Sequence, residues 1–595
     1  MIQLIKSLSL SLSLSLSLSL RKLGLLSVIS LFAITVAWSY LYKLNILESG
    51  VIVDFADGVA HFDLSRGALE NPKNFFDNWA RPAHVLFSLL PAQFGMEGYI
   101  LSHILLMLVN SVLIIHLGTR WNLGAPWLLP WWMIANTAVI HVTLGGLTEP
   151  LFILLSLLSL VLLDAKRWFG LGLVLGATLI ARHEALLLIA VVFFYVSFSE
   201  GYNAIQRGAI GFFILLTAVS ILGIVWGGKS SLFWIVSDQP YGRNPNVYGA
   251  GTWTHFWDNR RFWASKVMIG AFGISLGVAL FELFTTKKLN VKFIPFAIAL
   301  GTLTAHTILW KFGLMGSLGL TRILSIAVPF MALGVHTLNW KGGLFVVPFF
   351  LGHVYQWNRD SPDTKYQKSV QQIVSENDLD GLGGIPPSIR IAAQWKLPLI
   401  LKGFPTNNSE RMVKLWDLPP LLPSSAMREG DLIIWDNVTG FREGGIDLAI
   451  CRRDAGLQLI DSVEHYGVKL VVFRVVHSDN EELLVTSKLV KSLSGYGVWT
   501  SNNAGELLIR SPKKYGRIMQ LKQNSTTRVT WNGSPNGQLV IRFHNGFERH
   551  MGSEGALIFK QIKKPIMLLW RAENGEALMH FEAIKAQGQK QATSN

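Results

Sequence analysis

The chain has 595 residues, of which 50% are hydrophobic and only 15% are charged. Charged residues make up about a quarter of an ordinary soluble protein, so this composition excludes a chain that is soluble throughout. The net charge of +15 comes without a Lys/Arg-rich run or a recognition helix, which argues against nucleic-acid binding. Cys451 is the single cysteine, which excludes an intrachain disulfide and a cysteine metal cluster.

The N-terminal residues 1–22 predict a low-complexity extension, because seven Ser-Leu pairs fill positions 7–20. Strict period-two alternation suits neither an amphipathic helix nor a clean membrane span. Arg21 and Lys22 then precede an uncharged apolar stretch, 23–42. This stretch has no small-residue cleavage site and is long enough to span a bilayer, so we expect an uncleaved signal anchor.

Residues 23–357 predict a mostly α-helical, polytopic membrane domain of about eleven transmembrane helices, because apolar blocks of about 16 to 20 residues recur. The predicted spans are 23–42, 98–117, 125–142, 149–164, 168–181, 184–199, 208–226, 265–284, 293–310, 323–338 and 342–357.

Basic residues set the predicted orientation. The short loops on one side carry Arg120, Lys166, Arg207 and Lys341, and this side also holds Arg21, so we assign it to the cytoplasm. Eleven spans from a cytoplasmic N-terminus place the C-terminal domain outside. We therefore expect a multi-pass plasma (inner) membrane protein with a periplasmic or otherwise extracytoplasmic C-terminal domain.

Polar residues gather in the predicted first outward loop, 43–97, which contains VDFADGVAHFDLSRG and NWARPAHVLFSLLPAQFG. The apolar spacing from Asp57 to Leu69 predicts a short helix lying in the interface, which Asn71-Pro72 ends. Arg81-Pro82 opens a second amphipathic segment, 83–94.

After residue 357 the apolar blocks shrink to strand length and a soluble region begins. Residues 358–514 predict an α/β domain, with buried strands at LIIWD (432–436) and KLVVFRVV (469–476) and helices at 445–465 and 480–493. Residues 515–595 predict a small β-rich, antiparallel subdomain, because short strand-like segments alternate with Gly/Asn/Pro turns.

Three residues at the predicted outer surface are candidates for chemistry, because ionisable side chains at membrane depth are energetically costly. Asp57 could act as a general base whose pKa is raised by desolvation, or it could simply begin a helix. Asp54 is a weaker version of the same case. Arg322 could bind a phosphate through its planar fork of donors, or its side chain could extend to ordinary lipid phosphate.

Other polar residues could have purely structural roles. Arg182 and Glu184 could pair with each other, and Glu149 could begin a helix together with Pro150. We expect His141 and His306 to be interhelical hydrogen-bond partners rather than metal ligands. No nucleotide-binding loop or common hydrolase motif is present, and we predict no metal site.

Taken together, these segments resemble the GT-C superfamily of membrane glycosyltransferases. DFADGVAHFDLSRG followed by NWARPAHVLFSLLPAQFG looks like the family's first outward loop, which holds an acidic catalytic residue. The stretch that begins TEPLF and ends ARHEALLLI is similar to a second family segment, and GLMGSLGLTRILSIAVPFMALG resembles a late one. The resemblance covers about residues 23–357. Within the superfamily, the pattern is nearest to protein mannosyltransferases that use dolichyl-phosphate mannose and to lipid A aminoarabinose transferases.

Two positions depart from the family pattern. The usual paired acid is here Asp57-Gly58, so the second carboxylate is either absent or supplied by Asp54. The family's TRPEG pattern is ARHEA in this chain and lacks the proline.

The resemblance implies an inverting transfer of a sugar from a polyprenyl-phosphate donor to an acceptor hydroxyl on the outer face of the membrane. Asp57, with Asp54, would be the general base. The residues implied in binding the donor phosphate or the substrate are Arg322, Arg182, His183, Arg81, His61, Glu149, Arg243 and Tyr248. The reaction requires no cofactor, although a divalent cation, Mg²⁺ or Mn²⁺, could bridge phosphate and carboxylate.

The predicted partners are a polyprenyl-phosphate sugar and membrane lipid, and the sequence leaves the acceptor open among protein, lipid and glycan. Two other classes of function fit the same polar outer face. One is a transporter or flippase of lipid-linked glycans, although no internal repeat is visible. The other is a non-catalytic membrane scaffold with a partner-binding soluble domain.

Overall fold

A computed structural model describes two units of the chain, Met1–Gln371 and Gln372–Asn595. In the first unit the described residues are 24–47, 52–54, 57–237, 250–287, 289–314, 319–339 and 343–349. In the second they are 388–401, 404, 406, 410–418, 423–437, 440, 446–454, 456–465, 468–476 and, from 491 to 585, the backbone of the strands and residue 551.

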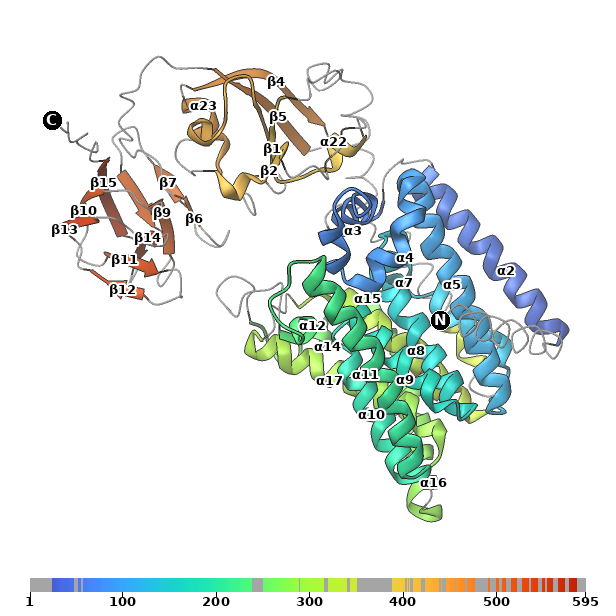
Figure 1. Ribbon diagram of the computed structural model, residues 1–595. Helices are drawn as coiled ribbons and strands as arrows, with labels where there is room; N and C mark the ends of the chain where they lie inside the picture. The colour runs from blue at the N-terminus through green and yellow to red at the C-terminus, as the bar shows by residue number, and fades with distance from the viewer. Residues whose placement is uncertain are drawn as a thin grey trace. The chain divides into compact units, whose positions relative to one another are not determined.

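The first unit is helical (Figure 1). Its elements up to residue 199 are α2 (Leu25–Tyr42), η1 (Lys43–Leu47), α3 (Asp57–Arg66), η2 (Pro72–Phe76), α4 (Pro82–Gln93), α5 (Gly95–Arg120), η3 (Pro126–Leu128), α6 (Leu129–Ile134), α7 (Thr137–Leu144), α8 (Glu149–Asp164), α9 (Trp168–Ala181) and α10 (Ala185–Ser199). The elements that follow are α11 (Tyr202–Val225), α12 (Trp234–Ser237), α14 (His255–Asp258), α15 (Arg260–Trp263), α16 (Lys266–Thr286), η4 (Val291–Phe293), α17 (Ile294–Phe312), η5 (Thr321–Ala327), α18 (Val328–Val335) and η6 (His336–Leu338).

Within the described residues, six helical stretches are long and apolar enough to cross a membrane, and a bent pair of helices raises the number to seven. The chain is thus a multi-pass membrane protein. Helices α9 and α10 are apolar but shorter, and α8 has 16 residues. The count of eleven spans stays a prediction, and most of its last span, 342–357, lies outside the described residues.

The predicted span 125–142 is not a straight helix. It bends by 68° between Pro126–Ile134 and Thr137–Leu144. Asn136 sits at the break, and its side-chain oxygen accepts hydrogen bonds from the backbone N–H groups of Ala138 and Val139. An Asn at this position starts a new helix, which explains why the apolar block does not continue as one rod.

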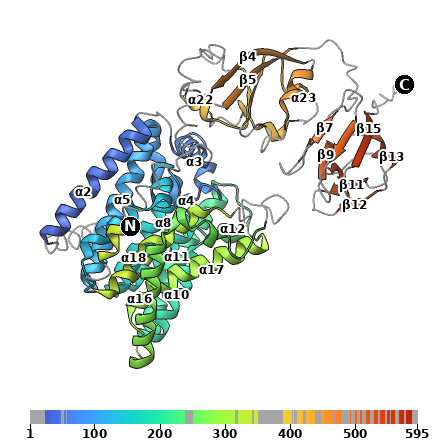
Figure 2. The same cartoon turned by 180° about the vertical axis from the view of Figure 1, so that it is seen from behind.

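Glycines allow helices α9 and α11 to pack closely. A Cβ added to Gly172 would lie 1.9 Å from the carbonyl oxygen of Gly208, and one added to Gly211 would lie 2.3 Å from that of Phe169. Small residues permit such close backbone contact between membrane helices. Figure 1 shows these two helices side by side, and in Figure 2 α18 lies near α16 and α17, against which it packs.

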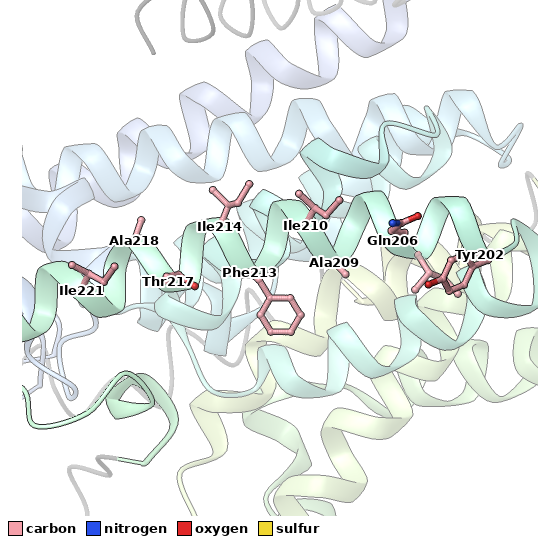
Figure 3. A pocket seen from close by; sticks show the side chains of 10 residues that line it. Tyr202, Gln206, Ala209, Ile210, Phe213, Ile214, Thr217, Ala218 and Ile221 are labelled. Atoms are coloured by element: carbon pink, nitrogen blue, oxygen red, sulfur yellow. The ribbon is translucent and has the colours of Figure 1, made fainter.

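The outer surface of the helical unit is apolar. Figure 3 shows a shallow groove along α11 lined by aliphatic and aromatic side chains such as Ile210, Phe213 and Ile214, with Tyr202 and Gln206 at one end. Exposed apolar side chains also cover much of α2, α10 and α16. Such a surface is stable only against lipid or another apolar surface.

The two short helices predicted in the first outward loop are present as α3 and α4. After α3, the side chain of Asn71 accepts a hydrogen bond from the backbone N–H of Lys73 and begins η2 with Pro72. Pro82 begins α4, and Arg81 before it has a φ of 70°. The predicted start of a helix at Arg81-Pro82 is therefore confirmed. The predicted stop is not, because α3 already ends at Arg66 and Asn71-Pro72 instead begins η2.

The second unit begins with a mixed five-stranded sheet in the order β2-β1-β3-β5-β4. Its elements are β1 (Ile391–Ala393), α22 (Leu397–Leu401), β2 (Met412–Val413), η7 (Leu415–Asp417), η8 (Pro423–Ala426), β3 (Leu432–Asp436), α23 (Leu448–Arg453), β4 (Leu457–His465) and β5 (Val468–Val475). The two predicted buried strands are confirmed as β3 and β5. Their inward side chains, Ile433, Trp435, Val471 and Phe473, pack with α23 in one core.

The helix predicted at 445–465 is wrong over most of its length. Helix α23 is short, and β4 follows it and pairs antiparallel with β5. The residues of this segment fit a helix or a strand when considered alone, and the pairing with β5 decides its conformation. Of the predicted helix at 480–493, only Lys491–Ser492 is described, and it forms a strand, β6.

The C-terminal strands form two antiparallel five-stranded sheets, in the orders β13-β10-β15-β8-β7 and β12-β11-β14-β9-β6. The strands are β6 (Lys491–Ser492), β7 (Trp499–Ser501), β8 (Glu506–Ile509), β9 (Tyr515–Leu521), β10 (Thr527–Gly533), β11 (Gly537–Phe543), β12 (Glu548–His550), β13 (Glu554–Phe559), β14 (Ile566–Ala572) and β15 (Ala577–Lys585). Strands on both sides of residue 515 pair with one another.

Candidate functional site

The start of α3 is fixed against the end of α7. The backbone N–H of Val53 donates to the carbonyl oxygen of Leu144 at 3.1 Å. The carboxylate of Asp54 accepts a hydrogen bond from the backbone N–H of Gly58 at 3.2 Å and so caps the first turn of α3. These contacts hold Asp54 beside the first turn of α3, which Asp57 begins.

Gly58 is required at its position by packing. A Cβ there would lie 1.9 Å from the carbonyl oxygen of Gly145 and 3.0 Å from the Ile52 side chain. The position after Asp57 therefore has no room for a second acidic side chain. The second carboxylate of the site is that of Asp54.

We predict that Gly58→Ala destabilises the protein by about 1–3 kcal/mol and lowers any activity of the site, because backbone atoms cannot move aside for the methyl group. Gly273→Ala is the matched control, since a Cβ at Gly273 in α16 meets nothing within 4 Å. Thermal unfolding of the purified variants in detergent measures the difference. Equal stability of the two variants would contradict the packing argument.

Arg322 connects the two carboxylates. It lies in η5, which packs against α7, and its two terminal nitrogens pair with Asp54 Oδ2 and Asp57 Oδ2. The structure thus brings together residues 268 positions apart in the chain. An arginine fork that bridges two carboxylates holds all three groups in a defined geometry.

The environments of the two carboxylates differ. The side chain of Asp54 is 6% exposed and also lies 3.5 Å from His141 Nε2, whereas that of Asp57 is 33% exposed. Burial opposes ionisation of Asp54, but the charge of Arg322 and the contact with His141 outweigh it and lower the pKa of Asp54 below its usual range.

For Asp57 the balance is reversed. Burial raises the pKa of Asp57 above the ordinary value of an aspartate, the charge of Arg322 counteracts part of this increase, and the neighbouring charge of Asp54 adds to it. Asp54 therefore stays ionised as the partner of Arg322. Asp57 is the more exposed of the two carboxylates and the one with the raised pKa.

A second ion-pair cluster surrounds Arg182. Its guanidinium nitrogens lie 2.8 Å from Glu149 Oε1 and 2.7 Å from Glu184 Oε1, and it donates to Thr148 Oγ1 at 2.5 Å. His306 Nε2 lies 3.7 Å from Glu184. Arg182 pairs with Glu184, and Glu149 begins α8. Both agree with the structural alternatives predicted for these residues.

Arg81 and His183 contact each other. The two terminal nitrogens of Arg81 lie 3.1 and 3.2 Å from the ring nitrogens of His183. His183 Nε2 is also 2.8 Å from the carbonyl oxygen of Ile235. This contact joins the start of α4 to α12.

His61 is enclosed in the core. It is 5% exposed, and its ring lies 4.6 Å from that of Trp79 and 5.3 Å from that of His84. Neither ring nitrogen has a hydrogen-bond partner in the described part of the chain. Burial lowers the pKa of His61 to about 3, so the ring is neutral at physiological pH.

Three further residues named from the sequence are Arg243, Tyr248 and His141. Arg243 and Tyr248 lie outside the described residues. His141, predicted to pair between helices, instead faces Asp54. The sequence signal for this role was weak, since it consists of a histidine just before the Gly145-Gly146 turn.

A metal could bind only through clustered ligands. In the parts of the chain that the structure describes, no group of three or more His, Cys, Asp or Glu side chains is arranged to hold a metal ion. The positive charge beside the two aspartates is that of Arg322.

No protein-family model and no curated protein sequence matches the chain. Among solved structures, the chain resembles membrane glycosyltransferases of the GT-C class. One is ArnT from Cupriavidus metallidurans bound to undecaprenyl phosphate, with a TM-score of 0.46 and 11% identity over 75% of this chain and 97% of that one. Another is the arabinofuranosyltransferase AftD from Mycobacteria, with a TM-score of 0.43 and 10% identity over 94% of this chain and 59% of that one. Likeness at this level establishes no activity for this chain.

Proposed function

We propose that the chain is a membrane glycosyltransferase that moves a sugar from a polyprenyl-phosphate donor to an acceptor hydroxyl, with inversion at the anomeric carbon and on the outer face of the membrane. The observation that carries the proposal is the bridge from Arg322 to Asp54 and Asp57. In this bridge the carboxylate that would act as the base lies directly beside the cation that would bind the donor phosphate, in a protein with an apolar outer surface.

The donor phosphate competes for Arg322. Asp57 is the more exposed of the two carboxylates, so a phosphate approaching Arg322 displaces Asp57 more readily than Asp54. Asp54, which also contacts His141 and Gly58, keeps the other arm of the guanidinium in place. Binding of the donor therefore frees the carboxylate of Asp57 for the acceptor.

Transfer then needs one proton acceptor and one anion stabiliser. Asp57 takes the proton from the acceptor hydroxyl as its oxygen bonds to the anomeric carbon, and the bond from that carbon to the phosphate oxygen breaks with its electron pair. Arg322 stabilises the negative charge that develops on the departing lipid phosphate. Because Arg322 supplies this positive charge, the reaction as proposed needs no metal.

Arg182 is a less suitable phosphate ligand than Arg322. Its two carboxylate partners, Glu149 and Glu184, are 4% and 20% exposed, so neither is displaced as easily as Asp57. We assign this cluster to holding α8 and α10 beside the site. The contact between Arg81 and His183 joins α4 to the same region.

The experiment uses purified protein in liposomes with undecaprenyl phosphate carrying labelled mannose, galactose or arabinose, and bacterial membranes as the source of acceptors. We expect label to leave the lipid for one of these donors and free undecaprenyl phosphate to appear. A transporter would instead move the intact labelled lipid between leaflets. Intact lipid throughout, with each donor, would refute the transferase.

The pH dependence of transfer follows from Asp57. Only the ionised carboxylate accepts a proton, and its pKa is raised, so kcat/KM should fall as the pH drops through a value above the usual aspartate pKa of about 3.9. His61 is already neutral above its pKa of about 3 and adds nothing to this limb. The acid limb of the pH profile measures the effect. If Asp57→Glu left that limb at the same pH, the base would be a different group.

A further inference from the structure

The backbone turn that leads into Arg322 is held by a histidine from another loop. Gly319, three residues before Arg322, has a φ of 64°, and its carbonyl oxygen accepts a hydrogen bond from His255 Nε2 at 2.7 Å. His255 begins α14 and is half-buried. The bond ties two segments that are 64 residues apart.

The side chain of Trp310 packs against both segments, the one that contains Gly319 and the one that contains Gly251 and His255. A Cβ on Gly319 would lie 2.8 Å from Cε2 of this indole, and one on Gly251 would lie 1.6 Å from its Nε1. The backbone N–H of Gly251 also donates to the carbonyl oxygen of Trp310 at 3.0 Å. The ring of His255 packs 5.0 Å from that of Trp310. Gly319 therefore packs closely against the rings of Trp310 and His255, which leave no room for a side chain at this position.

The far end of the His255 loop is anchored in the core. Trp263 Nε1 donates to the carbonyl oxygen of Phe256 at 2.9 Å. The backbone carbonyl oxygen of Trp263 accepts a hydrogen bond from Asn136 Nδ2 at 2.8 Å. Trp263 and Phe256 are both 2% exposed. Because Asn136 caps α7, the loop is attached to the helix that carries His141. The segment that begins with His255 is thus held by hydrogen bonds among buried residues.

We infer that His255 is a positioning residue for Arg322: its Nε2–H holds the Gly319 carbonyl and thereby sets where the guanidinium stands between Asp54 and Asp57. Arg322 is only the second residue of η5, so a shift of Gly319 is passed on through a short stretch of chain. A displacement of about 1 Å at a reacting group can cost on the order of a hundredfold in rate. The inference rests on the proposed role of Arg322 at the donor phosphate.

Two substitutions separate the hydrogen bond from the packing. His255→Gln keeps an N–H donor at a similar reach, and His255→Phe keeps a ring against Trp310 but removes the donor. We expect His255→Phe to lower kcat/KM for the active polyprenyl-phosphate sugar by about tenfold to a hundredfold. His255→Gln should stay within about threefold of the unmodified protein. Trp257→Phe, which changes an exposed ring in the same helix, is the matched control.

A double-mutant cycle with Arg322→Lys tests the mechanism. Lys has a single ammonium group in place of the planar guanidinium, so its function depends less on orientation. His255→Phe should therefore lower kcat/KM little further in the Arg322→Lys background. A purely structural histidine would lower the rate by the same factor in both backgrounds and would lower thermal stability in parallel. Equal rates for His255→Phe and the unmodified protein, with Arg322→Lys impaired, would overturn the inference alone. An unmodified protein that cleaves none of the donors would overturn the proposed function itself.

Discussion

Asp57→Asn is expected to reduce sugar transfer by about a thousandfold or more, because the amide cannot accept the proton of the acceptor hydroxyl. The substitution keeps the size of the side chain and an oxygen that can accept a hydrogen bond from Arg322. Asp54 remains as the buried partner of that arginine. The variant should therefore insert, fold and bind the polyprenyl-phosphate donor while failing to turn it over.

The measurement compares kcat with donor affinity in the same preparation. Glu70→Gln is the control, since it removes an exposed carboxylate from the same loop. The loss of the Asp57 charge also leaves Arg322 easier for a phosphate to reach, so donor affinity should hold or increase. Full transfer activity in Asp57→Asn would remove the assignment of the base.

Local sequence signals were sufficient for the short elements around the site. Arg81-Pro82 begins α4 through the fixed backbone of its proline, so this helix start could be predicted, whereas α3 ends at Arg66 without such a signal. The same holds for Glu149-Pro150 at the start of α8. Each of these depends on contacts within a few residues.

The contacts that make the site depend on distant parts of the chain. The requirement for Gly58 comes from the carbonyl of Gly145, and the roles of His141 and His255 come from packing between helices. None of these leaves a periodic or motif-like trace in one sequence. The absence of an acid directly after Asp57 shows the same limit, because Asp54 pairs with the same arginine as Asp57 although the two carboxylates are not adjacent in sequence.

Distant packing also explains the misassigned strand in the second unit. The segment from Leu457 pairs with β5, and its neighbour in the sheet decides its conformation. Its mixed apolar and polar residues fit either a helix face or an edge strand when they are considered alone. Buried strands such as β3 have a continuous apolar run and could be predicted directly.

Arg322→Gln should abolish transfer and also destabilise the fold, and a second substitution separates the two effects. Loss of the guanidinium leaves the buried Asp54 without its main counter-charge, which commonly costs about 3–5 kcal/mol, and removes a stabiliser of the departing phosphate, worth about a hundredfold or more in rate. In the double variant Asp54→Asn/Arg322→Gln no uncompensated charge remains at position 54. We expect thermal stability to recover most of the way in the double variant while transfer stays absent.

Arg66→Gln, at an exposed position at the end of α3, is the matched control for loss of one arginine. Recovery of both stability and transfer in the double variant would mean that Arg322 only balances Asp54 and has no part in the chemistry. Recovery of neither would mean that Arg322 holds η5 through contacts other than this ion pair. Recovery of stability without transfer is the result expected if Arg322 both balances Asp54 in the folded protein and stabilises the departing phosphate during the reaction. Removing the charge of Asp54 can restore the first function but not the second.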